Sequence, residues 1–209
     1  MSAVRLADWC RDNAVPNAMS GAFFWRPAER CLGEIWVNGV RHQTEPFSTP
    51  WDRIRGTLHI IDGLVSIGGR NEFPEQPNGD LLQAGPLLVR RGRSMVADGQ
   101  DAEGFSLAAD QFDSDITDGR YPRSAVGCND DCIFSVAVDG RGPGDAGLTM
   151  EELADCMVAL GATDALNLDG GGTATLINGG VMRNTSRNDV LTTNPNGRPV
   201  HSAIVFSNL

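Results

Sequence analysis

Two aspartates each end an apolar run and lead directly into glycine. Asp139 follows Val-Ala-Val and precedes Gly-Arg, whereas Asp169 follows Leu-Asn-Leu and precedes three glycines and Thr173. The backbone N–H groups of a glycine-rich turn can approach an anion closely, because glycine has no Cβ. The two segments therefore predict a site at two strand ends that combines carboxylates with an anion-binding turn.

The side chains next to these aspartates are suited to hold a substrate. Alternation along a strand places Asn167 and Asp169 on one side and the flanking leucines on the other. A guanidinium can form two hydrogen bonds to one anion, which suits Arg123 and Arg141 to an anionic ligand. Glu34 is a further carboxylate that could reach the site from an N-terminal strand. The predicted substrate-binding residues are Arg123, Arg141, Asn167, Gly170, Gly171, Gly172, Thr173 and Glu34.

Structural roles remain open for several of these residues. Asp139 could form an Asx-turn with Gly140, and Arg123 could pair with the acidic loop before it. His201 near the last strand is expected to be a packed residue. The glycine turn is neither a P-loop, since Gly-Lys-Ser/Thr is missing, nor a Rossmann turn, since no helix is predicted after it.

Metal binding is indicated only by the acidic segment DQFDSDITDGR. Its Asp113, Asp115 and Asp118 are candidate ligands for a divalent cation such as calcium, although the segment lacks the glycine and closing glutamate of an EF-hand. Zinc is disfavoured because Cys128 and Cys132 have no second Cys/His pair behind them. These two cysteines are expected at a hairpin tip, as free thiols or as a cross-strand disulfide.

Composition excludes several classes of function. The chain has 209 residues, of which 41% are hydrophobic and 21% charged, so one globular domain spanning residues 1–209 is expected. Its formal net charge of −10 disfavours nucleic-acid partners. All 17 basic residues are arginine, which excludes a lysine Schiff base or a Walker lysine. No apolar run reaches the roughly 18 residues of a membrane span. The start MSAVRLADWC does not resemble a signal peptide, so a cytoplasmic location is expected.

Strands must position most of the candidate residues. Short β-branched or aromatic runs between turn residues predict strands at 21–24, 33–37, 56–61 and 64–67, with turns at Asn38-Gly39 and Asp62-Gly63. A strand and a hairpin follow from Leu81, and residues 97–123 are expected to form a long loop. Further strands are predicted at 124–128, 133–138 (buried), 165–168, 173–177 and 200–206.

Two helices complete the expected fold. Leu6, Trp9 and Cys10 form one apolar stripe of a short helix that Ser2 could cap. Thr149 and Glu152 form a capping box for a second helix, which Gly161 ends. The pattern predicts an α+β fold: a single domain of mixed, mostly antiparallel β-sheets with a few packed helices.

The segment GLTMEELADCMVALGATDALNLDGGGTATLINGG resembles the phosphodiester glycosidase family. Three further segments are similar to that family: AGPLLV at 84–89, YPRSAVG before the strand that ends in VDGR, and GRPVHSAIVF near the end. Together they cover about residues 81–206. SGAFF at 20–24 is similar to the family's Asn-Gly-Gly-Phe-Phe, with Ser20 and Ala22 in place of the asparagine and the second glycine.

The resemblance implies a hydrolase that cleaves the C1–O bond of a sugar 1-phosphodiester. Because the start of the chain does not resemble an export signal, a bacterial or phage-borne role is expected. The implied substrate is similar to an N-acetylglucosamine 1-phosphodiester, and the products are free sugar and a phosphate monoester. By position, Asp139 and Asp169 correspond to family acids. A phosphate leaving group needs charge stabilisation more than a strong acid, so arginines matter as much as carboxylates. The alternatives are a non-catalytic module that binds glycosyl phosphates, and a metal-dependent phosphodiesterase that cuts P–O with a cation held by Asp113, Asp115 or Asp169.

Overall fold

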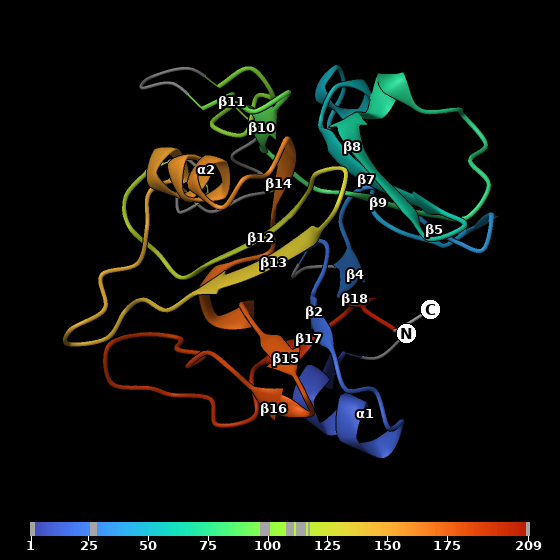
Figure 1. Cartoon of the computed structure of the whole chain (residues 1–209). Helices are drawn as coiled ribbons and strands as arrows, with labels where there is room; N and C mark the ends of the chain where they lie inside the picture. Colours follow the sequence, from blue (N-terminus) through green and yellow to red (C-terminus); the bar gives the residue numbers. More distant parts are fainter. Residues whose placement is uncertain are drawn as a thin grey trace.

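Antiparallel β-sheets are the main regular structure of the computed structural model, which describes residues 3–25, 29–96, 101–107, 111, 116 and 118–207 (Figure 1). The sheet that carries both aspartate segments has five strands, in the order β11-β10-β14-β12-β13. Since β13 and β14 are both antiparallel to β12, they run in the same direction and end at the same edge. The bounds are β10 (Leu87–Arg90), β11 (Arg93–Ser94), β12 (Arg123–Cys128), β13 (Ile133–Val138) and β14 (Asp164–Leu168).

Close packing covers both faces of this sheet. Helix α2 (Met150–Ala159) lies on one face, where Met157 Cε comes within 2.6 Å of the position that a Cβ would take at Gly127. On the opposite face, Leu166 Cδ1 lies 2.3 Å from the corresponding position at Gly56. Glycine at these two positions therefore lets the helix and the neighbouring sheet approach the central strands. Leu153, Met157 and Leu166 are fully buried in the resulting core.

The second five-stranded sheet has the order β6-β5-β9-β7-β8. Its hairpin turns at Asn38-Gly39 and Asp62-Gly63 have positive φ at both residues, as predicted. The chain then leaves this sheet after β9 and enters the first sheet at β10. The bounds are β5 (Ile35–Val37), β6 (Val40–Arg41), β7 (Gly56–Ile61), β8 (Leu64–Gly69) and β9 (Asp80–Gln83), with the short helices η2 (Trp51–Arg53) and η3 (Arg70–Glu72).

The two ends of the chain meet in smaller sheets, close to each other in Figure 1. A four-stranded sheet has the order β16-β15-β2-β18, and β1 pairs with β17. Helix α1 (Leu6–Asp12) buries Leu6 and Cys10 in a second hydrophobic cluster. The bounds are β1 (Val4–Arg5), β2 (Ala18–Ser20), β15 (Leu176–Asn178), β16 (Val181–Met182), β17 (Pro199–Val200) and β18 (Ala203–Val205), and a separate pair joins β3 (Phe24–Trp25) to β4 (Arg30–Cys31).

The α+β fold class with mostly antiparallel sheets is confirmed, whereas some local predictions are wrong. The strand predicted at 21–24 is interrupted: β2 ends at Ser20, the N–H groups of Gly21 and Ala22 both donate to Ser202, and β3 begins only at Phe24. Strand β13 was expected to be buried but is an edge strand, half-buried along most of its length. Helix α1 begins at Leu6 with Arg5 as N-cap, so the Ser2 cap is wrong, and Trp9 is 36% exposed.

The C-terminal predictions need two further corrections. The strand expected at 173–177 begins only at Leu176, because Gly171–Thr173 forms the 3-10 turn η5. The last strand is divided into β17 and β18 around His201 and Ser202. No helix among the described residues is long and apolar enough to cross a membrane.

Candidate active site

Asp139 and Asp169 lie at the same edge of the first five-stranded sheet. Each follows the last residue of a strand that flanks β12: Val138 pairs with Arg123, and Leu168 pairs with Ser124. Since neighbouring strands lie about 4.8 Å apart, the backbones of the two aspartates are separated by about 10 Å. Both aspartates are half-buried. The topology therefore brings together the two strand ends that the sequence singled out.

Pro122 lies between the two glycine turns, and its backbone leaves no room for a side chain at one glycine of each turn. A Cβ at Gly140 would lie 2.7 Å from Pro122 N, and one at Gly170 would lie 2.8 Å from Pro122 O. The same carbonyl accepts a hydrogen bond from Gly171 N–H at 2.8 Å. Only glycine allows both turns to close on the start of β12 in this way.

The next two glycines face arginines from distant segments. Gly171 has φ +59°, and the position of its missing Cβ lies 3.5 Å from both Nη atoms of Arg141. The corresponding position at Gly172 lies 2.7 Å from Arg198 Cδ and 2.6 Å from Asn188 Oδ1. Two basic side chains thus stand next to consecutive residues of one turn.

Arg141 is held in place from several sides. Its φ of +58° is uncommon for a residue other than glycine, and such conformations cluster at functional sites. Its Nη1 donates to Asn188 O at 2.9 Å, and its guanidinium carbon lies 5.3 Å from the centroid of the Tyr121 ring. A cation above an aromatic face is stabilised electrostatically. Arg141 is therefore a positioned cation beside the glycine turn.

The segment 185–194, which the sequence did not indicate, ties the two aspartate turns together. Thr185 N–H donates to Asp139 Oδ1 at 2.6 Å, and Ser186 Oγ donates to Gly172 O at 2.5 Å. Further along the same segment, the Asp189 carboxylate accepts hydrogen bonds from the N–H groups of Leu191 and Thr192. These hydrogen bonds lower the pKa of the Asp189 carboxyl. The segment is polar and has no hydrophobic period, so only its tertiary contacts reveal its place in the site.

SGAFF and GRPVHSAIVF, two of the family-like segments, meet beside Asp169. Asp169 N–H donates to Gly21 O at 3.1 Å, and Ala22 N–H donates to Ser202 Oγ at 2.9 Å. Burial raises the pKa of the neighbouring Cys31 thiol; the Ser202 hydroxyl opposes this shift, and the Asp169 charge adds to it. A neutral thiol therefore lies near the Asp169 carboxylate.

An aromatic contact lies on the same side of the site. The Phe24 ring centroid lies 5.3 Å from that of His201 and 5.9 Å from the guanidinium carbon of Arg198. His201 is thus packed against an aromatic ring, as the sequence predicted. Arg198 and Ser202 were missed as site residues, although the GRPVHS segment that contains them was among the family-like segments.

Three of the predicted substrate-binding side chains hold the backbone of the site in this structure. Arg123 is 3% exposed, and its Nε and Nη2 donate to Leu148 O (2.9 Å) and Gly119 O (3.1 Å). Asn167 is 2% exposed and donates to Gly85 O at 2.8 Å. Thr173 donates to Gly170 O at 2.5 Å and so closes the glycine turn. Their direct binding of a substrate remains a prediction.

Glu34 has its contacts in and beside the second five-stranded sheet. Its carboxylate accepts Arg70 Nε at 2.6 Å, Arg41 Nη2 at 3.2 Å and Trp36 Nε1 at 3.4 Å. None of these partners belongs to the glycine turn or to the segments around it. The structure therefore gives Glu34 an ion-pairing role, and its part in substrate binding remains a prediction.

Only one of the three predicted metal ligands lies among the described residues. Asp113 and Asp115 lie outside the described residues, and Asp118 is exposed. Within the described part of the chain, no group of three His, Cys, Asp or Glu side chains is placed to hold a metal ion. Cys128 is buried and Cys132 exposed at their hairpin, and the two sulfurs are not bonded to each other.

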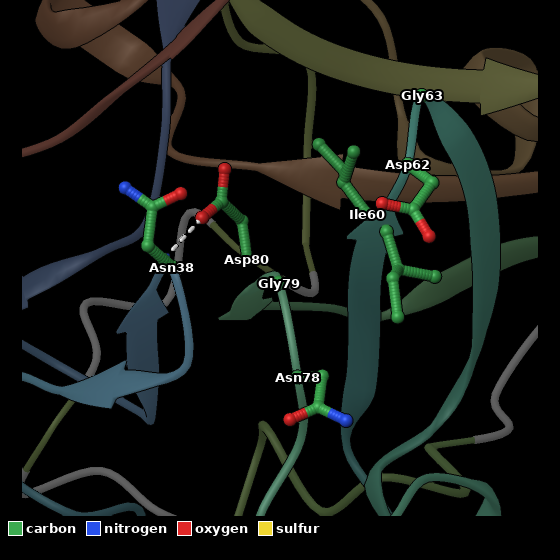
Figure 2. Close-up of a pocket in the computed structure, with 8 residues that line it drawn as sticks. Asn38, Ile60, Asp62, Gly63, Asn78, Gly79 and Asp80 are labelled. Atoms are coloured by element: carbon green, nitrogen blue, oxygen red, sulfur yellow. Dashed lines mark hydrogen bonds between the residues drawn. The ribbon is translucent and has the colours of Figure 1, made fainter.

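An open hollow of about 470 Å³ lies elsewhere, at the turns of the second five-stranded sheet (Figure 2). Asp80 Oδ1 accepts Asn38 N–H at 2.7 Å along its rim. None of the predicted site residues lines it. Its lining residues are Asn38, Ile60, Ile61, Asp62, Gly63, Asn78, Gly79 and Asp80.

Comparison with solved structures shows the same fold in two other proteins. The catalytic domain of zebrafish N-acetylglucosamine-1-phosphodiester alpha-N-acetylglucosaminidase, auto-inhibited by its pro-peptide, matches with a TM-score of 0.67 and 17% identity, over 100% of this chain and 67% of that one. A hypothetical protein from Synechocystis matches with a TM-score of 0.66 and 18% identity, over 88% of this chain. The match spans only 51% of the Synechocystis protein. At such identities these likenesses show the fold alone.

Comparison at the level of sequence gives the family. A search of curated proteins found no match. The sequence model of the family described as phosphodiester glycosidase matches residues 13–207, which include both aspartate turns and the segments that surround them. The chain therefore belongs to the phosphodiester glycosidase family.

Proposed function

We propose that this protein hydrolyses the glycosidic C1–O bond of a sugar 1-phosphodiester and releases free sugar and a phosphate monoester. The observation that carries the proposal is the meeting of Asp139, Asp169 and Arg141 around one glycine turn. Family membership supports the reaction class. An N-acetylglucosamine 1-phosphodiester is the first substrate to test, because the zebrafish relative is named for it.

Arg141 is the group that we assign to the phosphate. As the C1–O bond breaks, the electron pair leaves with the phosphate, whose charge changes from −1 to −2. A cation placed beforehand at this position stabilises the developing charge without having to reorganise. The planar guanidinium is suited to two phosphate oxygens, and the contacts to Asn188 and Tyr121 hold it beside the turn.

The two aspartates supply the chemistry at the sugar. A water oxygen becomes bonded to C1, and one carboxylate takes the proton that this water loses, either directly or after a covalent step. Glycosidase carboxylates act at separations of about 5 to 9.5 Å. Side chains on backbones about 10 Å apart can reach that range when both point toward the same turn.

The direct test is release of free N-acetylglucosamine from its methyl 1-phosphodiester and from UDP-N-acetylglucosamine. We expect Asp139→Asn and Asp169→Asn each to lower the rate by about 100-fold or more. The amide oxygen that Asp139→Asn introduces can still accept the Thr185 N–H, so this variant removes the charge and keeps the loop contact. Asp155→Asn, at an exposed position of α2, is the matched control and should leave the rate unchanged.

Other products would support other functions. Sugar 1-phosphate as the first product would indicate P–O cleavage by a phosphodiesterase. Binding without turnover of either compound would indicate a glycosyl-phosphate binding module. Full activity of both aspartate variants would contradict the assigned roles.

A further inference from the structure

Arg198 approaches the glycine turn from a segment that the proposed reaction does not yet use. The side-chain stem of Arg198 packs on Gly172, with Cδ 2.7 Å from the Cβ position, while the guanidinium of Arg141 lies beside Gly171. Consecutive Cα atoms are about 3.8 Å apart, so the two arginines stand next to neighbouring points of one short turn. They come from segments 57 residues apart in the sequence (141 and 198).

The backbone before Arg198 is fixed by close packing. Gly197 is buried and has φ +76°, and a Cβ there would lie 2.8 Å from Thr175 Oγ1. Its N–H donates to Asn194 O at 2.9 Å. The guanidinium carbon of Arg198 then lies 5.9 Å from the Phe24 ring centroid. Arg198 is therefore a half-buried, positioned side chain, in contrast to a freely moving surface arginine.

The neighbouring arginine of the same region is directed elsewhere. Arg187 Nε lies 3.3 Å from the Cβ position of Gly142, and Asp145 Oδ2 lies 3.0 Å from that position. The Arg187 side chain thus belongs to the turn at 142–145. Arg123 has two of its donor nitrogens on backbone carbonyls. Arg123 and Arg187 approach the triple-glycine turn with backbone atoms, whereas Arg141 and Arg198 approach it with their side chains.

We infer that Arg198 is a second phosphate-binding residue, which forms with Arg141 a two-arginine clamp across the glycine turn. This inference rests on the proposed function. A phosphodiester has two non-bridging oxygens, and each oxygen can accept hydrogen bonds from both arginines. The monoester product carries a second negative charge, so two cations stabilise the departing group more than one can. The clamp therefore selects glycosyl phosphodiesters over glycosides with uncharged aglycones.

Kinetics on two substrates tests this selectivity. We expect Arg198→Gln to lower kcat/KM for the methyl N-acetylglucosamine 1-phosphodiester by about 10- to 100-fold, the size expected for one charged hydrogen bond. Hydrolysis of the uncharged nitrophenyl N-acetylglucosaminide should change by no more than about 3-fold. Arg198→Lys keeps the charge and should recover part of the loss. Arg183→Gln, at an exposed arginine whose Nε donates to Asn178 O in the β15–β16 hairpin, is the matched control.

Binding of inorganic phosphate, measured by calorimetry, tests the clamp without turnover. Wild type should bind phosphate, and Arg198→Gln and Arg141→Gln should each weaken the affinity by about 10-fold or more. An equal loss of kcat/KM on both substrates, or unchanged phosphate affinity in a folded Arg198→Gln variant, would overturn the clamp. Absence of phosphodiester turnover by wild type would refute the proposed function alone, because the phosphate affinities would still decide the role of Arg198.

Discussion

At the scale of single residues, the glycines of the site are required by backbone contacts. Gly170→Ala would place a Cβ 2.8 Å from Pro122 O, a backbone atom that cannot rotate away. We expect this variant to lower the free energy of unfolding by about 1–3 kcal/mol. Gly144→Ala is the matched control, since a Cβ there meets no described atom within 4 Å, and it should change stability by less than about 0.5 kcal/mol. Equal urea midpoints for the two variants would contradict the packing explanation.

Residue types and strand ends singled out the two carboxylates and Arg141, but they did not predict what each polar side chain contacts. Alternation places Asn167 on the same side of β14 as Asp169, yet the partner of its amide is the Gly85 carbonyl, 82 residues away. Likewise, Arg141 donates to the carbonyl of Asn188, 47 residues later. Such contacts depend on tertiary packing, so no local pattern reveals them.

At the scale of elements, α2 has the most complete local determinants. Thr149 Oγ1 accepts Glu152 N–H at 3.1 Å, and the Glu152 carboxylate accepts Thr149 N–H at 3.0 Å. Thr149→Ala removes the cap and should cost about 1 kcal/mol of stability in chemical denaturation. Asp155→Asn, on the exposed face of the same helix, should have a much smaller effect. A Thr149→Ala protein as stable as wild type would show that the cap does not contribute.

Predictions of helices and strands were correct where a local sequence pattern determines the element. They were wrong where packing against residues distant in the sequence determines it. The capping box and apolar stripe define α2, and positive-φ turn residues define the β7–β8 hairpin. In contrast, the exposure of β13 depends on its place at the sheet edge, which its own residues do not encode. Likewise, where the predicted strand at 21–24 is interrupted, the N–H groups of Gly21 and Ala22 donate to Ser202, a residue far away in the sequence.

At the scale of the whole molecule, Glu103 joins the two five-stranded sheets. Its Oε2 accepts Gly56 N–H at the start of β7 (2.6 Å), and its Oε1 accepts Leu87 N–H at the start of β10 (2.5 Å). Burial raises the pKa of the Glu103 carboxyl to about 7, against the opposing effects of these N–H groups and of the Arg55 charge; the Asp101 charge raises it further. Ionisation of this carboxyl is therefore less favourable in the folded protein than in the unfolded chain.

This shift predicts a pH dependence of stability. The pKa of Glu103 is higher in the folded protein than in the unfolded chain. Its contribution to the free energy of unfolding is therefore greatest below about pH 4.5 and falls as the pH rises to about 7. Glu103→Gln lacks the titration. The difference in unfolding free energy between wild type and this variant should therefore decrease by about 3 kcal/mol between pH 4.5 and pH 8. Urea denaturation of both proteins at the two pH values measures it, and a constant difference would contradict the assignment.

The bond that breaks is the central claim, and hydrolysis in ¹⁸O-labelled water tests it most directly. Mass spectrometry of the products from methyl N-acetylglucosamine 1-phosphodiester would locate the label. Cleavage at C1–O predicts ¹⁸O in the free sugar and none in methyl phosphate, because the water oxygen becomes bonded to C1. Label in the phosphate product, as labelled methyl phosphate beside unlabelled sugar or as labelled sugar 1-phosphate beside methanol, would show that a P–O bond breaks and would contradict the proposed function.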